Sequence, residues 1–132
     1  MRNNGANKMK RAILIGLALI TGVGLAHADG DAAKGEQTAK ACMACHSFTD
    51  KANKVGPSLV GIVGRKPGTA EAYAYSDAFK KYAAAAAAWD DATLDAYLKD
   101  PKAVVPGTKM AFAGVKDDAA RADLIAFLKT KQ

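Results

Sequence analysis

The chain has 132 residues, with 19 Lys and Arg against 13 Asp and Glu and a formal net charge of +6. This length accommodates one small domain and excludes a multidomain enzyme. The excess of basic residues raises the question of nucleic-acid binding, and the answer depends on where these residues lie along the chain.

The first 28 residues have the layout of a secretory signal peptide. Residues 1–11 contain four basic residues and no acid, and the uncharged run at 12–26 follows directly. The run ends at Ala26-His27-Ala28, where small residues flank the histidine. It is short and glycine-rich compared with the roughly 20 strongly apolar residues of a membrane span. We therefore expect export to the periplasm with cleavage after about Ala28, and an uncleaved membrane anchor is the alternative.

Cleavage after Ala28 would leave one domain, residues 29–132. It would remove four basic residues, so that 15 Lys and Arg remain against 13 acidic residues and the formal charge falls to +2. Most of the basic excess thus belongs to the export segment, and we expect no nucleic-acid partner. A domain of this size is marginally stable without a cofactor, a metal or disulfides.

The domain is predicted to begin with a helix from Asp31, a suitable cap, to about Lys40. The motif C-x-x-C-H follows at Cys42, Cys45 and His46, and this is the attachment signature for c-type haem. On a helix, residues three and four apart share a face. Both thiols can then form thioethers to the vinyl groups of one porphyrin, and His46 can bind the iron. Covalent attachment holds haem where two axial bonds alone would let it exchange.

Three other interpretations of the motif fit less well. A structural zinc site needs four ligands, and only two Cys and one His lie close together. A thioredoxin-like pair is expected after a strand, whereas the preceding residues read as helix. A plain disulfide is possible in an oxidising compartment but does not explain a histidine directly after the second cysteine.

The segments between the motif and the next helix have distinct compositions. Residues 55–68 are rich in glycine and predict loops that wrap a cofactor, with only the short run 58–63 resembling a strand. Lys80 to Ala88 contains six consecutive alanines and predicts a short helical extension. A second helix is expected to begin at Asp90 or Asp91 and to stop at Asp100-Pro101, with apolar residues at i, i+3 and i+4.

The sixth iron ligand can be assigned by elimination among the residues after position 28. No second histidine is present there, and Met43 lies between the attachment cysteines. Met110 is then the thioether that can reach the opposite face of the haem. It follows Pro106 and Gly107, which favour a tight turn that presents a side chain from a loop. A last helix is predicted from Asp117 or Asp118 to about Lys129.

Residues 29–132 resemble class I cytochrome c, the small soluble type of mitochondria and bacteria. Besides CMACH and PGTKM, the segments that match in order and spacing are Asn53 to Gly68, Tyr75 to Phe79, Leu94 to Lys102 and Arg121 to Lys129. The resemblance implies an all-α cytochrome c fold, with short helices and long loops wrapped around one covalently bound haem. It also implies a monomer.

The resemblance also assigns roles around the haem. The carbonyl of Pro57 would hold the N–H of the proximal imidazole. The haem propionates would be bonded or shielded by Arg65, Tyr75 and Trp89.

On the other side of the haem, the resemblance places Tyr97 and Thr108 near the methionine sulfur and Phe112 over the exposed haem edge. One departure from the family concerns the first helix, where Ala39 replaces the usual aromatic four residues after Gly35 and faces Phe127. A looser crossing of the first and last helices is therefore expected.

A haem with both axial positions filled has no open site for oxygen or peroxide. His46 and Met110 therefore predict a one-electron carrier rather than an enzyme. Its redox partners are expected to have acidic docking surfaces, since lysines lie in the segments that carry the haem ligands: Lys40, Lys54, Lys66, Lys102 and Lys109. The alternatives are a haem enzyme or a gas or redox sensor with a displaceable Met110, and a membrane-tethered carrier.

Overall fold

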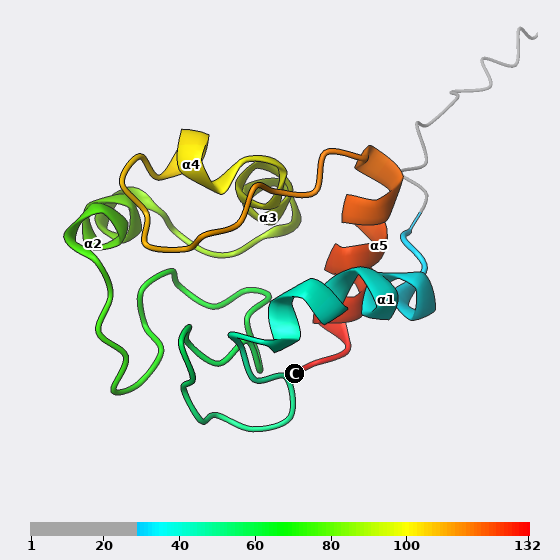
Figure 1. Cartoon of the computed structure of the whole chain (residues 1–132), viewed down its shortest axis with the longest axis horizontal. Helices are drawn as coiled ribbons and strands as arrows, with labels where there is room; N and C mark the ends of the chain where they lie inside the picture. Colours follow the sequence, from blue (N-terminus) through cyan, green and yellow to red (C-terminus); the bar gives the residue numbers. More distant parts are fainter. Residues whose placement is uncertain (1–28) are drawn as a thin grey trace, which may run out of the picture.

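The computed structural model describes residues 29–132. The proposed signal peptide, including Ala26-His27-Ala28, lies outside these residues. The described part of the chain is built from helices and loops without strands, so the run 58–63 is loop. The helices are α1 (Ala32–Met43), α2 (Asp77–Ala85), α3 (Asp91–Lys99), α4 (Pro101–Val104) and α5 (Asp118–Lys129). The predicted all-α class is confirmed (Figure 1).

Each helix begins after a polar side chain that accepts hydrogen bonds from free N–H groups of the first turn. The N-caps are Asp31, Ser76, Asp90, Asp100 and Asp117. Asp100 caps α4 directly after α3 ends, and Pro101 occupies the first helical position, where its missing N–H leaves no bond unmade. The caps at the starts of α1, α3 and α5 agree with those predicted from the sequence.

α2 differs from the predicted extension over residues 80–88. It begins earlier, because the Ser76 hydroxyl accepts the N–H of Phe79 at 3.1 Å, and it ends at Ala85. Beyond that point the chain is extended and Trp89 pairs with the loop before α2. The Trp89 N–H donates to the Arg65 carbonyl at 2.9 Å, and the Gly64 N–H donates to the Trp89 carbonyl at 2.9 Å. These bonds place the indole independently of the alanine run.

α1 and α5 cross closely at the right of Figure 1. A Cβ atom at Gly35 would overlap the carbonyl of Asp123, so the two backbones touch there. Ala39 is fully buried, and Phe127 packs against Phe48 with ring centroids 5.6 Å apart. The expected looser crossing is therefore wrong. Phe48, from the loop after α1, supplies the aromatic contact that α1 lacks.

A buried arginine connects α5 to α3 and to the chain segment before α5. Arg121 is 3 % exposed, and its Nε lies 2.6 Å from Asp95 Oδ1 on α3. Its Nη atoms donate to Asp118 at 2.8 Å and to the carbonyl of Val115 at 2.9 Å. Burial of a guanidinium is tolerated because its N–H groups are paired. The bond to Val115 fixes the end of the segment that carries Met110.

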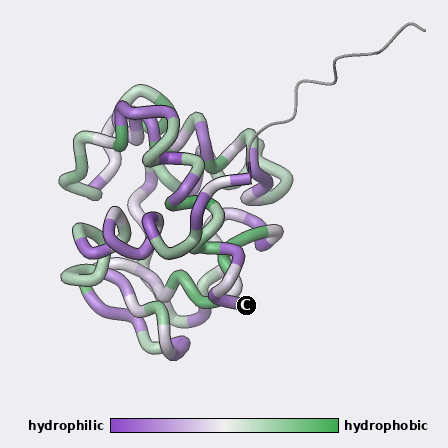
Figure 2. The backbone as a smooth tube through the Cα atoms, turned by 90° about the vertical axis from the view of Figure 1, so that its right-hand side faces the viewer, coloured by the Kyte–Doolittle hydropathy of each residue, from purple (hydrophilic) through white to green (hydrophobic). Residues whose placement is uncertain are grey.

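Hydrophobic and hydrophilic residues alternate in short stretches along the chain (Figure 2). The buried core lies where α1, α3 and α5 meet, and its largest fully buried side chains include Leu124 and Val105. Among residues 29–132, no helix has both the length and the apolar character needed to cross a bilayer.

One residue in the loop before α2 has a left-handed backbone. Ala72 has φ of 55°, which costs an alanine roughly 1–2 kcal/mol. We expect Ala72→Gly to stabilise the protein by about 0.5–1 kcal/mol, since glycine relieves this strain but adds freedom to the unfolded chain. Equilibrium denaturant unfolding measures the effect. Ala33→Gly in α1 is the control and should lose about 1 kcal/mol, and equal losses at both positions would contradict the prediction.

Candidate haem-binding site

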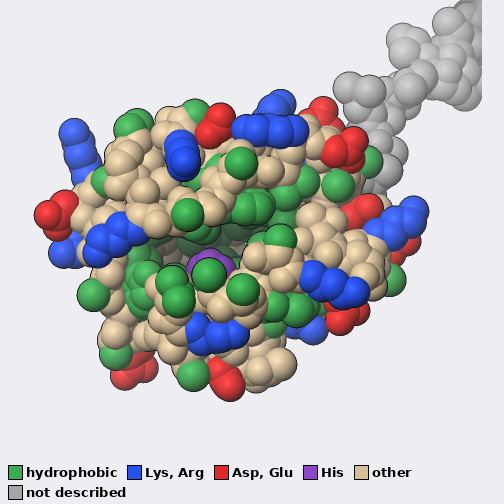
Figure 3. Space-filling model, viewed as in Figure 1, with side chains coloured by type: hydrophobic (Ala, Val, Ile, Leu, Met, Phe, Trp, Pro, Cys, Tyr) green, Lys and Arg blue, Asp and Glu red, His purple; other side chains and the backbone are tan. Residues whose placement is uncertain are grey.

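A cavity of about 420 Å³ opens at the centre of the molecule. Figure 3 shows it as a hollow with a histidine at its base, hydrophobic side chains on its walls and basic side chains around it. The structure brings all eleven residues predicted from the sequence to its lining: Cys42, Cys45, His46, Pro57, Arg65, Tyr75, Trp89, Tyr97, Thr108, Met110 and Phe112.

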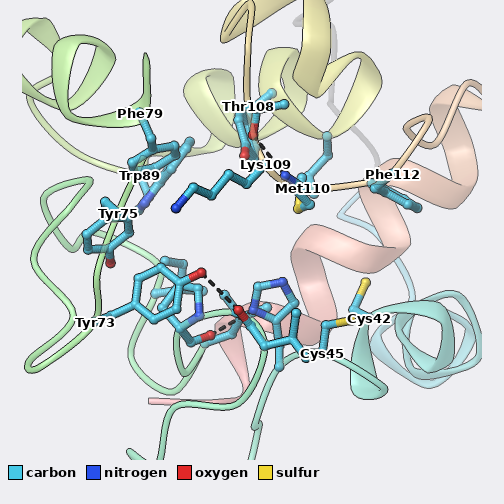
Figure 4. Close-up of a pocket in the computed structure, with 18 of the residues that line it drawn as sticks. Cys42, Cys45, Tyr73, Tyr75, Phe79, Trp89, Thr108, Lys109, Met110 and Phe112 are labelled. Carbon is cyan, nitrogen blue, oxygen red and sulfur yellow. Dashed lines mark hydrogen bonds between the residues drawn. The ribbon is translucent and has the colours of Figure 1, made fainter. Parts of the chain in front are cut away.

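The C-x-x-C-H motif lies at the end of α1 and just beyond it. The N–H groups of Cys45 and His46 both donate to the carbonyl of Cys42, at 3.1 and 2.9 Å. The bond from His46 is an i to i−4 bond, so the helical pattern continues one turn past Met43. Both thiols consequently line the same cavity as the imidazole (Figure 4).

The His46 side chain is held by a hydrogen bond at its Nδ1 atom. Its Nδ1 lies 2.7 Å from the carbonyl oxygen of Pro57. A carbonyl can only accept, so Nδ1 carries the proton and the lone pair is on Nε2, the form of imidazole that binds a metal. Burial lowers the pKa of His46, and the charge of Lys54 acts in the same direction. Gly56 packs on the ring, where a Cβ atom would overlap it.

The two thiols are free and partly buried. Burial raises the pKa of Cys42, and the neighbouring Cys45 raises it further. A thiol with a raised pKa is protonated at neutral pH and is not a reactive thiolate of the kind found in redox enzymes. Its place at the cavity edge is suited to covalent attachment of a ligand that fills the cavity.

Met110 approaches the cavity from the opposite wall (Figure 4). Its loop begins with a turn in which the N–H of Thr108 donates to the carbonyl of Val105 at 3.0 Å. Gly107, inside this turn, has φ of 84°, a conformation that favours glycine. The Thr108 hydroxyl accepts the N–H of Met110 at 3.3 Å, which orients the methionine relative to the turn.

Tyr97 lines the cavity from α3. Burial raises its pKa to about 12, although a hydrogen bond with Thr108 opposes this effect. The phenol therefore stays protonated at all pH values near neutral and remains a hydrogen-bond donor inside the cavity.

Aromatic rings form one continuous wall of the cavity. The Trp89 centroid lies 4.9 Å from that of Tyr97 and 6.3 Å from that of Phe79. Phe79 in turn stacks on Tyr75 at 5.0 Å, with an interplanar angle of 14°. Trp89 is only 5 % exposed, whereas Tyr75, Phe79 and Tyr97 are partly buried.

The polar residues expected near the haem propionates lie at the same wall. The Arg65 guanidinium donates to the carbonyls of Ser58 and Val60, at 3.0 and 3.1 Å. The Tyr75 hydroxyl accepts the N–H of Ala70 at 3.0 Å, and burial raises its pKa. Both side chains are thus held in place by the loop and face the cavity.

Several lining residues were not predicted from the sequence. Phe79 lines the cavity and packs, at a centroid distance of 5.8 Å, on Tyr82, which lies three residues further along α2 and outside the lining. Their i, i+3 spacing was a signal for one apolar helix face. Tyr73 had no comparable signal, because its role depends on a contact between loops distant in sequence. Gly56 belongs to the glycine-rich stretch that predicted close approach of the backbone to a cofactor, and it packs on the His46 ring.

Comparison with known proteins covers nearly the whole of this domain. The family model for cytochrome c matches residues 32–132. The chain belongs to the cytochrome c family. Members of this family carry covalent haem, and the chain binds one haem c through Cys42 and Cys45.

Similar proteins include cytochromes from several bacteria. Cytochrome c2 from Rhodomicrobium vannielii is 46 % identical over 125 residues, covering 94 % of this chain and 97 % of that protein. Cytochrome c2 from Blastochloris viridis is 47 % identical over 120 residues, covering 90 % and 92 %. The solved structure of cytochrome cH from Methylobacterium extorquens has a TM-score of 0.70 and 51 % identity, covering 77 % of this chain and 100 % of that one.

Proposed function

We propose that this cytochrome c is a periplasmic one-electron carrier with His46 and Met110 as the axial ligands of its haem. The supporting observation is that an imidazole with a free Nε2 and the thioether of Met110 line one apolar cavity. Two thiols at the edge of the same cavity complete the donor set for a covalently attached haem. The residues present therefore fit the cofactor of the family.

When bound, haem supplies an iron centre that gains or loses one electron. The protein holds the side chains around the haem in fixed positions. The Pro57 carbonyl fixes the imidazole plane, and Thr108 orients Met110. The buried indole of Trp89 packs on Tyr97 in the cavity wall. If His46 and Met110 both held the iron, no position on it would remain for a substrate, which favours a carrier over an enzyme.

Within residues 29–132, the lysines expected to dock a redox partner form no ion pairs, and Lys51, Lys81 and Lys131 form none either. Within residues 29–132, none of the five expected docking lysines lies within 4.0 Å of a carboxylate: Lys40, Lys54, Lys66, Lys102 and Lys109. By contrast, the lysines that form ion pairs are Lys34, Lys80, Lys99, Lys116 and Lys129. The uncompensated charges support docking of an acidic redox partner.

Lys54 and Lys109 differ in what their side chains contact. The Lys54 ammonium donates to the carbonyl of Met43 at 2.7 Å, so it also satisfies the C-terminal end of α1. Lys109 lies on the cavity rim, next to Met110. Lys131 is a poor control for charge reversal, because its ammonium lies over the Phe127 ring at 4.7 Å. Lys34 is a better control, because it lies in the first turn of α1, at the opposite end from the haem motif.

Charge reversal at the rim should slow association with an acidic partner. We expect Lys109→Glu or Lys40→Glu to reduce the second-order rate of electron transfer about two- to tenfold at low salt, whereas Lys34→Glu has little effect. Stopped-flow spectroscopy across a range of ionic strength measures this. The difference should shrink with added salt, since exposed charges are screened over roughly 8 Å at physiological ionic strength. Salt-independent rates, or equal effects at Lys34 and Lys109, would contradict acidic docking.

Export and processing can be tested on the purified protein. We expect intact-mass spectrometry of the protein from the periplasm to give residues 29–132 plus one covalent haem. The basic segment at 1–11, the uncharged run at 12–26 and the small residues at 26 and 28 support this expectation. A mass that includes residues 12–26 would instead support a membrane-tethered carrier.

A further inference from the structure

The loop of residues 53–57, here called the Pro57 loop, carries the carbonyl that holds His46. Gly56 is buried against the His46 ring, whereas the outer part of the loop is exposed. Its backbone is tied to the haem motif by the N–H of Gly56, which donates to the carbonyl of Cys45 at 2.8 Å. Val55 is 78 % exposed, so packing does not fix this part of the loop. Hydrogen bonds therefore contribute to the position of the Pro57 carbonyl.

Two side-chain hydrogen bonds join the Pro57 loop to the loop of residues 69–75. The Tyr73 hydroxyl donates to the carbonyl of Val55 at 2.9 Å (Figure 4). Asn53 Nδ2 donates to the carbonyl of Glu71 at 2.8 Å. Each bond links residues 18 apart in the sequence, and together we call them the loop clasp.

The clasp constrains the chain on both sides of Pro57. Tyr73 fixes the carbonyl of Val55, two residues before it. Asn53 Oδ1 accepts the N–H of Ser58 at 3.2 Å, one residue after it. The proline ring fixes the backbone angle φ of Pro57 itself. These flanking bonds therefore help to orient its carbonyl toward Nδ1 of His46.

We propose that Tyr73 and Asn53 are positioning residues that hold the Pro57 carbonyl on His46 and thereby set the donor strength of the imidazole. A partner that accepts the free N–H of a ligating histidine fixes the ring and raises its basicity, which tunes the metal. This inference rests on the proposed role of His46 as an axial ligand. It assigns to the two loops a function in the redox centre and not only in folding.

The test uses Tyr73→Phe in the haem-loaded protein. The substitution removes the hydroxyl but keeps the ring, which packs on Tyr75 with centroids 4.8 Å apart. A net hydrogen bond is worth roughly 0.5–1.5 kcal/mol, which corresponds to an opening equilibrium about two- to tenfold larger. We expect the Nδ1 proton of His46, followed by NMR in the reduced protein, to exchange with solvent faster by about this factor. The reduction potential should rise, because a weaker bond makes the imidazole a weaker donor.

Thr69→Ala provides the matched control. Its hydroxyl donates to the carbonyl of Lys66 at 2.7 Å, so this bond stays within one side of the clasp. Thr69→Ala should leave the exchange rate of the His46 proton and the potential unchanged. Asn53→Ala should accelerate exchange as Tyr73→Phe does, and it offers a second variant if one of them folds poorly.

The result that would overturn the proposal is an Nδ1 exchange rate and a potential that Tyr73→Phe and Asn53→Ala change no more than Thr69→Ala does. A loss of global stability without these changes would mean that the clasp is structural only. Failure of the proposed function would look different. If His46 were not an axial ligand, the wild-type spectrum would lack imidazole ligation whatever the state of the clasp.

Discussion

Met110→Ala should leave the haem covalently attached but convert the protein from one that excludes carbon monoxide to one that binds it stoichiometrically. Attachment depends on Cys42 and Cys45, which lie at the opposite wall from Met110 (Figure 4). Removing the thioether opens the sixth position of the iron and removes a soft ligand that favours the reduced state. The reduction potential should therefore fall. Carbon monoxide titration and potentiometry measure the two effects.

Met43→Ala is the matched control for this experiment. Met43 lies between the two cysteines and packs against the core, on the side of the imidazole. Its loss should cost stability through the vacated volume, with no effect on carbon monoxide binding. An unchanged visible spectrum in Met110→Ala, or the absence of a far-red sulfur-to-iron band in the wild type, would show that the ligand assignment is wrong.

Three helices, α1, α3 and α5, could be predicted from local signals. Asp31, Asp90 and Asp117 each precede a run with helical spacing, and each caps a helix in the structure. The eleven predicted site residues could be named because the C-x-x-C-H motif and the family resemblance placed them. Their shared cavity then follows from the fold.

The remaining features depend on tertiary contacts that no local pattern encodes. α2 ends at Ala85 although alanine favours continued helix, because Trp89 pairs with Arg65 on a distant loop. The replacement of an aromatic by Ala39 predicted a loose crossing, yet Phe48 packs on Phe127 from another element. The loop clasp is likewise a pair of bonds between residues 18 apart.

The second large effect is expected at Gly56, one of the glycines of the stretch 55–68 that predicted close approach of the backbone to a cofactor. A Cβ atom there would meet three atoms of the His46 ring at distances no real Cβ contact shows. The imidazole cannot yield without breaking its 2.7 Å bond to the Pro57 carbonyl. We expect Gly56→Ala to cost about 3 kcal/mol of unfolding free energy or to abolish accumulation of haem-loaded protein.

Gly61→Ala separates this clash from the general cost of replacing a loop glycine. Gly61 has φ of 67° but no atom within 4 Å of its Cβ position. Its substitution should therefore cost only the backbone strain of roughly 1–2 kcal/mol and leave haem ligation intact. Denaturant unfolding and the visible spectrum of both variants provide the comparison. If Gly56→Ala were no more destabilising than Gly61→Ala and kept the wild-type spectrum, the imidazole would not be confined by the backbone of the Pro57 loop. The Pro57 carbonyl would then be its only restraint on that side, and the loop clasp would matter more to the redox centre than close packing does.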